Sequence, residues 1–189
     1  TEANKDKVSN YSMAFDGVDD FVSIYDGASG SGPILFTASD DFSISAWIKT
    51  SSTAATNQIL SFRGTALIWF YTTGANRRLV MYLRDDSSNA AIMTSYNSAA
   101  GYITADTWTN VLFTRNGTTK DMNMYLNGVA AQVTATDTTS DDFTAYDKLS
   151  IANDDYGGGR YWFDGNIDEV AIFDSDQSGN AVTIYNSGT

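Results

Sequence analysis

Short runs in which every second residue is apolar recur along the chain, separated by Gly, Asn, Asp, Ser and Thr. The clearest run covers residues 42–49, and Asn127-Gly128, between two further runs, is the strongest short signal for a β-hairpin. Strands at this spacing, with only residues 177–186 resembling a short helix, predict a β-sandwich or β-barrel. The other expected strands are Gln58–Phe62, Ala66–Thr72, Leu79–Arg84, Ala90–Tyr96, Trp108–Arg115, Asp121–Leu126, Val129–Thr136, Leu149–Ala152 and Ile167–Phe173.

The net charge of the chain limits the classes of partner that it can bind. Its 189 residues include 23 acidic and 11 basic side chains, which gives a net charge of −12. Nucleic acid and anionic membranes both require a basic surface, so we expect neither as a partner. An acidic surface either keeps a protein soluble or supplies oxygen ligands to Ca²⁺, and the composition leaves both readings open.

Cysteine and histidine are both absent. The chain therefore lacks disulfides, the usual zinc and copper ligands, and the Ser-His-Asp and Cys-His catalytic arrangements. No stretch approaches the roughly 20 apolar residues of a transmembrane helix, so no membrane insertion is expected. A start without Met and a Ser187-Gly188-Thr189 ending are typical of a module excised from a longer protein.

Six segments match, in order, the strand motifs of a known family. They are Phe15–Val22, Asp40–Lys49, Trp108–Arg115, Met124–Gly128, Leu149–Ala152 and Phe163–Phe173. On these segments the chain resembles the laminin-G-like domains of the concanavalin-A-like lectin/glucanase superfamily. The resemblance implies an all-β, two-sheet antiparallel jelly roll over residues 12–186, preceded by a tail or linker at 1–11 and followed by the start of a linker at 187–189.

The ending Ala171–Gly188 is similar to modules of marine phage structural proteins and of secreted bacterial proteins. This likeness implies an extracellular or cell-surface location, or alternatively a place in a virion. A glycan or another cell-surface ligand is the expected partner, together with other copies or domains of a larger parent protein.

The resemblance also implies a structural Ca²⁺ near the two chain ends. Carried over to this sequence, its ligands are Asp16, Asp168 and the backbone around Gly17, with Asp19 and Asp20 as alternatives. Ca²⁺ prefers six to eight oxygen ligands, and backbone carbonyls supply some of them. The alternative is that Asp16 forms a turn and Asp168 accepts a backbone hydrogen bond or a salt bridge.

Aromatic residues make up 13% of the chain and provide surfaces on which sugar rings pack. One candidate platform consists of Trp69, Tyr71 and Tyr82 on one sheet face. The favoured binding site is the glycine-containing loop from Asp154 to Trp162, whose flexible backbone can approach a ligand. In that loop the expected ligand-binding residues are Asp154, Asp155, Tyr156, Arg160 and Trp162.

Two further aromatic residues are assigned to packing, because Trp47 and Trp108 match core positions of the family motifs. Laminarinase-type hydrolases share the fold, but they need two carboxylates across the scissile bond, usually on a Glu-x-Asp-x-x-Glu strand. The chain has no such strand, and its two glutamates are Glu2 and Glu169. We therefore expect a non-catalytic recognition or adhesion module. A decoration domain that acts by protein contacts is the alternative, and a glycoside hydrolase is the third reading.

Overall fold

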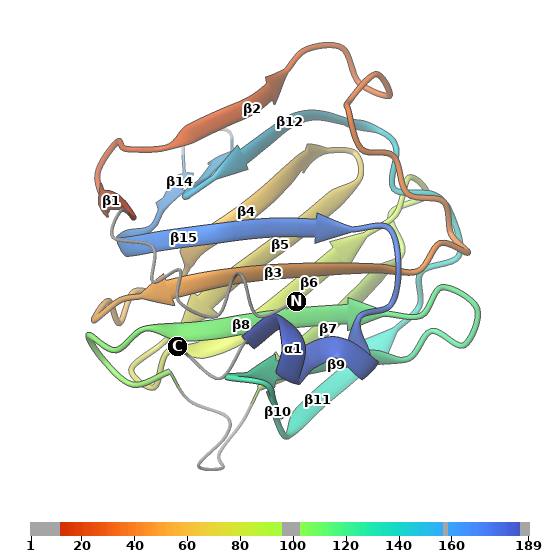
Figure 1. The fold of residues 1–189 in the computed structure, drawn as a ribbon. Coiled ribbons are helices and arrows are strands. Elements are labelled where there is room, and N and C mark those ends of the chain that lie inside the picture. The colour runs from red at the N-terminus through yellow and green to blue at the C-terminus, as the bar shows by residue number, and fades with distance from the viewer. Residues whose placement is uncertain (1–11, 96–102, 157–158, 186–189) are drawn as a thin grey trace.

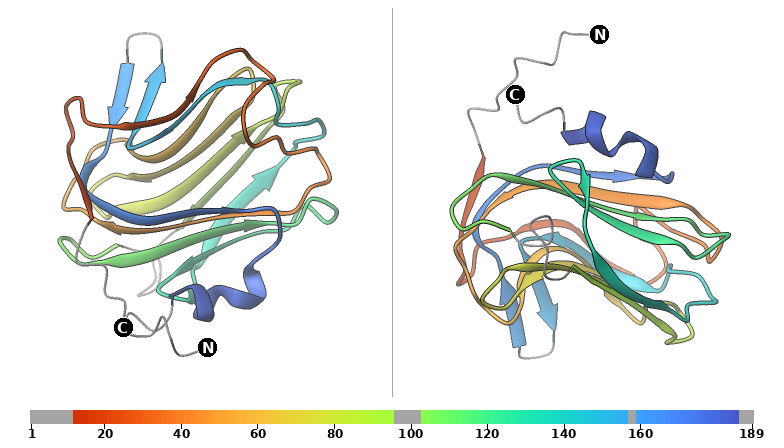
Figure 2. Two further views of the ribbon diagram at one scale, coloured as in Figure 1. Left: turned by 45° about the horizontal axis from the view of Figure 1, so that its top comes forward. Right: turned by 90° about the horizontal axis from the view of Figure 1, so that it is seen from below.

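The structure is a computed structural model that describes residues 12–95, 103–156 and 159–185, without the side chains of 155–160. Two antiparallel sheets face each other as the two layers of a sandwich (Figures 1 and 2). The first sheet contains, in spatial order, β1 (Met13–Asp16), β15 (Asp164–Phe173), β3 (Phe42–Lys49), β8 (Thr109–Arg115), β9 (Met122–Leu126) and β10 (Val129–Ala130). The second contains β11 (Val133–Asp137), β7 (Ala90–Ser95), β6 (Arg78–Arg84), β5 (Leu67–Thr73), β4 (Asn57–Gly64), β12 (Tyr146–Ile151) and β2 (Val22–Asp26). The predicted jelly-roll sandwich is confirmed.

The core lies between the sheets and follows the alternation of the strands. On β3, the inward side chains of Phe42, Ile44, Ala46 and Ile48 are all 0% exposed. The ring centroid of Phe42 lies 4.5 Å from that of Phe36 in a stacked arrangement. Because side chains alternate along a strand, the residues between these four face away from the core.

The assignment of Trp47 and Trp108 to the core was wrong. Trp47 occupies an outward position of β3 and is half-buried beneath Tyr185, whose ring centroid lies 5.6 Å away. Trp108, one residue before β8, is also half-buried, with the Lys49 ammonium 5.6 Å from its ring centroid. The alternation that buries Ile48 requires Trp47 to point outward.

Two expected elements differ in the structure. The run expected as one strand over residues 129–136 is divided between the sheets, since β10 pairs with β9 and β11 pairs with β7. Alternation indicates a strand but not the partner to which it hydrogen-bonds. The segment expected as a loop over 154–162 instead contributes to a hairpin of β13 (Asn153–Tyr156) and β14 (Gly159–Trp162).

The two ends of the domain meet in one sheet. β1 pairs antiparallel with β15, and Asp16 lies opposite Asp164. Gly17 follows with a φ of +76°, a left-handed conformation that glycine adopts without strain. A Cβ at this position would lie 2.9 Å from the Cβ of Asp164, so the turn also requires the absence of a side chain.

The short helical segment expected near the C-terminus is present as η2 (Ser178–Asn180) and α1 (Ala181–Tyr185). It lies outside the six-stranded sheet, whereas the β13–β14 hairpin projects on the opposite side of the sandwich (Figure 2). Within the described part of the chain, no helix is long and apolar enough to cross a membrane.

Candidate functional site

A row of side chains crosses the outer face of the seven-stranded sheet. Trp69 on β5 lies opposite Tyr82 on β6, which in turn lies opposite Ile92 on β7. The ring centroids of Trp69 and Tyr82 are 5.6 Å apart, and Ile92 is 42% exposed. Directly opposed residues on neighbouring strands share one face of the sheet, so these side chains form a continuous apolar strip. This strip contains two of the three residues of the expected platform.

Tyr71, the third residue of that platform, projects to the same side as Trp69, which lies two positions earlier on β5. Burial raises the pKa of its phenol, and the nearby hydroxyls of Tyr161 and Tyr82 raise it further. Tyr71 is therefore protonated at neutral pH and can donate or accept a hydrogen bond. Tyr161, on β14, is 37% exposed. We call Trp69, Tyr71, Tyr82 and Tyr161 the aromatic face.

The aromatic face contains a polar group that the protein leaves unsatisfied. The indole Nε1 of Trp69 is buried and has no hydrogen-bond partner among the described residues. The guanidinium of Arg63, on β4, lies 5.9 Å from the centroid of the same indole. Buried polar groups are normally hydrogen-bonded, so an orphaned donor distinguishes this face from ordinary sheet surface.

The β13–β14 hairpin is fastened to β4 through Asp154. The carboxylate of Asp154 accepts a hydrogen bond from Ser61 Oγ at 3.3 Å and lies 3.7 Å from Arg63 Nε. Asp154 is 0% exposed, so it holds the hairpin in place rather than offering its carboxylate at the surface, which corrects the expectation from the sequence. This contact positions Tyr161, its cross-strand partner, against the sheet.

Trp162, another expected ligand residue, is half-buried, and its ring centroid lies 5.7 Å from that of Phe21. Its cross-strand partner is Asn153, so the two belong to the other side of the hairpin from Asp154 and Tyr161. The side chains of Asp155, Tyr156 and Arg160 lie outside the described part of the structure.

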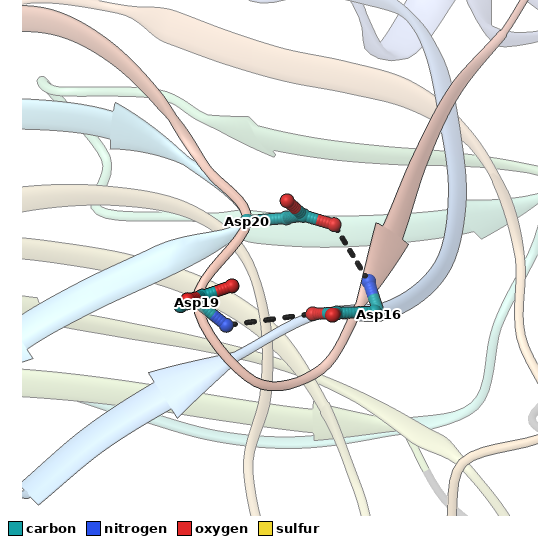
Figure 3. A group of neighbouring side chains, drawn as sticks. All are labelled: Asp16, Asp19 and Asp20. Carbon is teal, nitrogen blue, oxygen red and sulfur yellow. Dashed lines mark hydrogen bonds between the residues drawn. The ribbon is translucent and has the colours of Figure 1, made fainter.

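Three carboxylates meet in the loop between β1 and β2 (Figure 3). One oxygen from each of Asp16, Asp19 and Asp20 lies within 4.8 Å of the others, and all three residues are exposed. Asp16 Oδ1 accepts hydrogen bonds from the backbone N–H of Val18 at 2.8 Å and of Asp19 at 3.4 Å. The backbone N–H of Asp16 donates to Asp20 Oδ2 at 3.2 Å, so the loop holds its carboxylates together.

Asp168 is not part of this group. Its backbone pairs with Trp47 on β3, whereas Asp164 is the β15 residue opposite Asp16. Four residues along a strand separate positions by about 13 Å, too far for one ion to bind both Asp16 and Asp168. Asp168 Oδ1 instead accepts a hydrogen bond from the backbone N–H of Glu169 at 2.8 Å. The structure favours the alternative ligands, Asp19 and Asp20, over Asp168.

Sequence reasoning missed Arg63 and Tyr161. Arg63 carries no local signal, because its contact with Trp69 depends on the pairing of β4 with β5. Tyr161 could have been found from the alternation of Arg160, Tyr161 and Trp162, which places Tyr161 and Trp162 on opposite sides of a strand.

A sequence model described as the concanavalin A-like lectin/glucanases superfamily matches residues 16–183. No curated protein matches the sequence.

Among solved structures, the CBM40 of the Ruminococcus gnavus IT-sialidase, bound to α2,3-sialyllactose, has a TM-score of 0.66 and 16% identity, covering 93% of this chain and 97% of that one. The native heptameric SAP-like pentraxin of Limulus polyphemus has a TM-score of 0.56 and 17% identity, over 85% of this chain and 79% of that one. The binding domain of botulinum neurotoxin serotype G has a TM-score of 0.62 and 15% identity, over 94% of this chain and 47% of that one. At these identities the likeness concerns the fold.

Proposed function

Because the chain belongs to the concanavalin A-like lectin/glucanases superfamily, we propose that it is a non-catalytic glycan-binding module whose ligand lies on the aromatic face. The observation that carries this proposal is the strip of Trp69, Tyr82 and Ile92 on the outer face of one sheet. Sugar rings present C–H faces that pack on such side chains. Tyr71 and Tyr161 add hydroxyl groups that can hydrogen-bond to those of a sugar.

The β13–β14 hairpin extends this site. Its residues Asp155, Tyr156, Arg160 and Trp162 can contact a glycan that reaches beyond the sheet, while Asp154 holds the hairpin to β4. A structural neighbour supports a sugar ligand in general terms, since the R. gnavus CBM40 was solved with α2,3- and α2,6-sialyllactose. One aromatic contact contributes about 1 kcal/mol beyond the energy of the surface area that it buries. A single site is therefore expected to bind with a dissociation constant on the order of micromolar to millimolar.

Replacing aromatic side chains by alanine tests whether glycan binds to the aromatic face. We expect Trp69→Ala and Tyr82→Ala each to weaken glycan binding about 10-fold, because each removes a stacking surface that contributes about 1.4 kcal/mol. The measurement is retention on a glycan array, followed by titration calorimetry with the best ligand. Tyr156→Ala with Trp162→Ala reports separately on the hairpin.

The matched control is Trp47→Ala, which removes an indole from the opposite side of the sandwich. It should leave binding unchanged, and far-UV circular dichroism should show all variants folded. Equal binding by the parent and by the Trp69 and Tyr82 variants would contradict the proposed face. A parent that binds no glycan on a broad array would favour the decoration-domain alternative.

We also propose a structural Ca²⁺ in the β1–β2 loop. The three clustered carboxylates are hard oxygen donors at a spacing that one ion can bridge, and backbone carbonyls around Gly17 can complete the shell. Asp16, Asp19 and Asp20 would hold the ion next to the β1–β15 pairing. The ion would there stabilise the junction of the two chain ends.

We expect no hydrolytic activity. Glycoside hydrolysis needs one protonated and one ionised carboxyl group across the bond, and the sequence lacks the strand that supplies them in laminarinase-type enzymes. Incubation with laminarin, agarose and carrageenan should release no reducing sugar. Release that a single Asp→Asn substitution abolishes would contradict this prediction.

The proposed ligand implies a setting in which glycans are accessible. We propose an extracellular or cell-surface location, or a virion, with the module joined to other domains or copies. Weak single-site binding would then gain strength from several copies that engage one surface together.

A further inference from the structure

A small pocket lies on the seven-stranded sheet near its β2 edge, beside the β13–β14 hairpin. Its volume is about 150 Å³, and its lining comes from β2, β12, β4, the hairpin and Phe21, the last residue of the β1–β2 loop. β4 separates this part of the sheet from the strands that hold Trp69 and Tyr82. The pocket borders both sites described above, because Arg63 also lies over the Trp69 indole and Phe21 follows Asp20 in the β1–β2 loop. None of the four aromatic-face residues and none of the three clustered carboxylates lines it.

Asn153 lines the pocket and is only 3% exposed, yet its Oδ1 has no hydrogen-bond partner among the described residues. Ser150, which also lines the pocket, donates its hydroxyl to the backbone carbonyl of Asn153 at 2.8 Å and fixes that residue in place. A buried, unpaired amide oxygen is destabilising, so an apolar residue would suit this position better if packing alone mattered. Sequences depart from the rule that buried polar groups are hydrogen-bonded mainly at functional sites.

The charges around the pocket are balanced. Lys148 lies directly opposite Asp26 in the antiparallel pair of β12 and β2, and Arg63 lies 3.7 Å from Asp154. Each of these two cations is accompanied by a carboxylate, so an anionic ligand gains little from entering. The remaining polar lining residues are Ser23, Tyr25, Ser150 and Asn153, of which Tyr25 donates its hydroxyl to the backbone carbonyl of Ala28 at 2.7 Å.

One wall of the pocket is apolar. Phe21 lines it and is 48% exposed, and its ring centroid lies 5.7 Å from that of Trp162. A cavity of about 150 Å³ holds one six-membered ring such as benzene. From the size, the aromatic wall, the balanced charge and the unpaired amide, we propose that this pocket binds one uncharged, hydroxyl-rich ring the size of a single hexose. This proposal does not rest on a ligand at the aromatic face, although Arg63 lies beside both sites.

The test is a titration followed by backbone amide shifts of the ¹⁵N-labelled chain. The probes are methyl α-glucoside, methyl β-galactoside, methyl α-mannoside and, as the charged comparison, N-acetylneuraminic acid. At least one neutral glycoside should shift the amides of Ser23, Ser150 and Asn153, with a dissociation constant on the order of millimolar. Asn153→Leu should weaken that binding at least tenfold while the melting temperature stays equal or rises, because the unpaired oxygen is removed.

Two control variants show whether the binding belongs to this pocket. Asn123→Leu makes the same substitution at an exposed position on β9 and should change neither binding nor shifts. Trp69→Ala should keep the shifts at Ser150 and Asn153 even if it abolishes binding at the aromatic face. The proposal is overturned if no neutral probe shifts these amides, if only N-acetylneuraminic acid does, or if Asn153→Leu binds as the parent does. Loss of the pocket shifts in Trp69→Ala would show that the pocket is not a separate site.

Discussion

Arg115→Met is expected to lower the free energy of unfolding by about 3–5 kcal/mol, because it leaves a buried carboxylate without its cation. Arg115 is 0% exposed at the end of β8, and its Nε lies 3.6 Å from Asp137 Oδ2. Its other nitrogens donate to the backbone carbonyls of Asp40 and Ala38, each at 3.2 Å. Burial lowers the pKa of Arg115, and the neighbouring Asp137 opposes that shift. The measurement is a urea titration of the variant and the parent. If both have the same m-value, the difference between their midpoints gives the change in the free energy of unfolding.

Two further variants identify the cause. Arg78→Met removes an exposed arginine and should change stability by no more than about 0.5 kcal/mol. Arg115→Met combined with Asp137→Leu should recover part of the loss, since a buried pair replaced by apolar groups is often nearly neutral. A cost below about 1 kcal/mol for Arg115→Met would show that the pair contributes little to stability.

Chelation of Ca²⁺ is expected to lower the melting temperature. An ion that binds only the folded chain stabilises it by about 2.7 kcal/mol when its free concentration is 100 times the dissociation constant. For a domain of this size that corresponds to roughly 5–11 °C. The measurement is a thermal melt by circular dichroism in Ca²⁺ and in EDTA, with Mg²⁺ as the ionic control.

The substitutions discriminate between the two possible ligand sets. Asp19→Asn with Asp20→Asn should erase the response to EDTA, because it removes two of the three clustered carboxylates. Asp168→Asn should keep the response, because Asp168 lies apart from the cluster. A melt that is indifferent to EDTA would contradict the calcium site, and loss of the response in Asp168→Asn alone would restore the ligand set inferred from the family.

Much of the fold could be predicted because its signals are local. Alternation over residues 42–49 identified both β3 and its buried face, and Asn127-Gly128 correctly marked the turn between β9 and β10. The errors arose where the pairing of strands in the folded structure decides which sheet a segment joins. Residues 129–136 alternate continuously, yet the chain leaves one sheet and joins the other within that run.

The candidate site was predictable only in part. Trp69, Tyr71 and Tyr82 were placed on one face because alternation along a strand is regular. The burial of Asp154 was not visible, since it depends on the hairpin folding over Ser61 and Arg63, some 90 residues earlier in the sequence. The exclusion of Asp168 from the proposed calcium site depends on strand register, which places Asp164 rather than Asp168 beside Asp16. No local pattern indicated the pocket at Asn153, because its walls come from four separate strands.

The position of the last strand has a consequence for how the protein is made. β15 lies between β1 and β3, so the six-stranded sheet has a gap in its interior until residues 164–173 have left the ribosome. Until then β1 lacks the one neighbour that it has among the described strands of that sheet, and β3 exposes one hydrogen-bonding edge. Unpaired edges of this kind invite pairing with other chains, and contacts between distant segments form slowly. A ribosome that stalls before residue 164 would therefore release a chain prone to aggregation rather than a shorter version of the module.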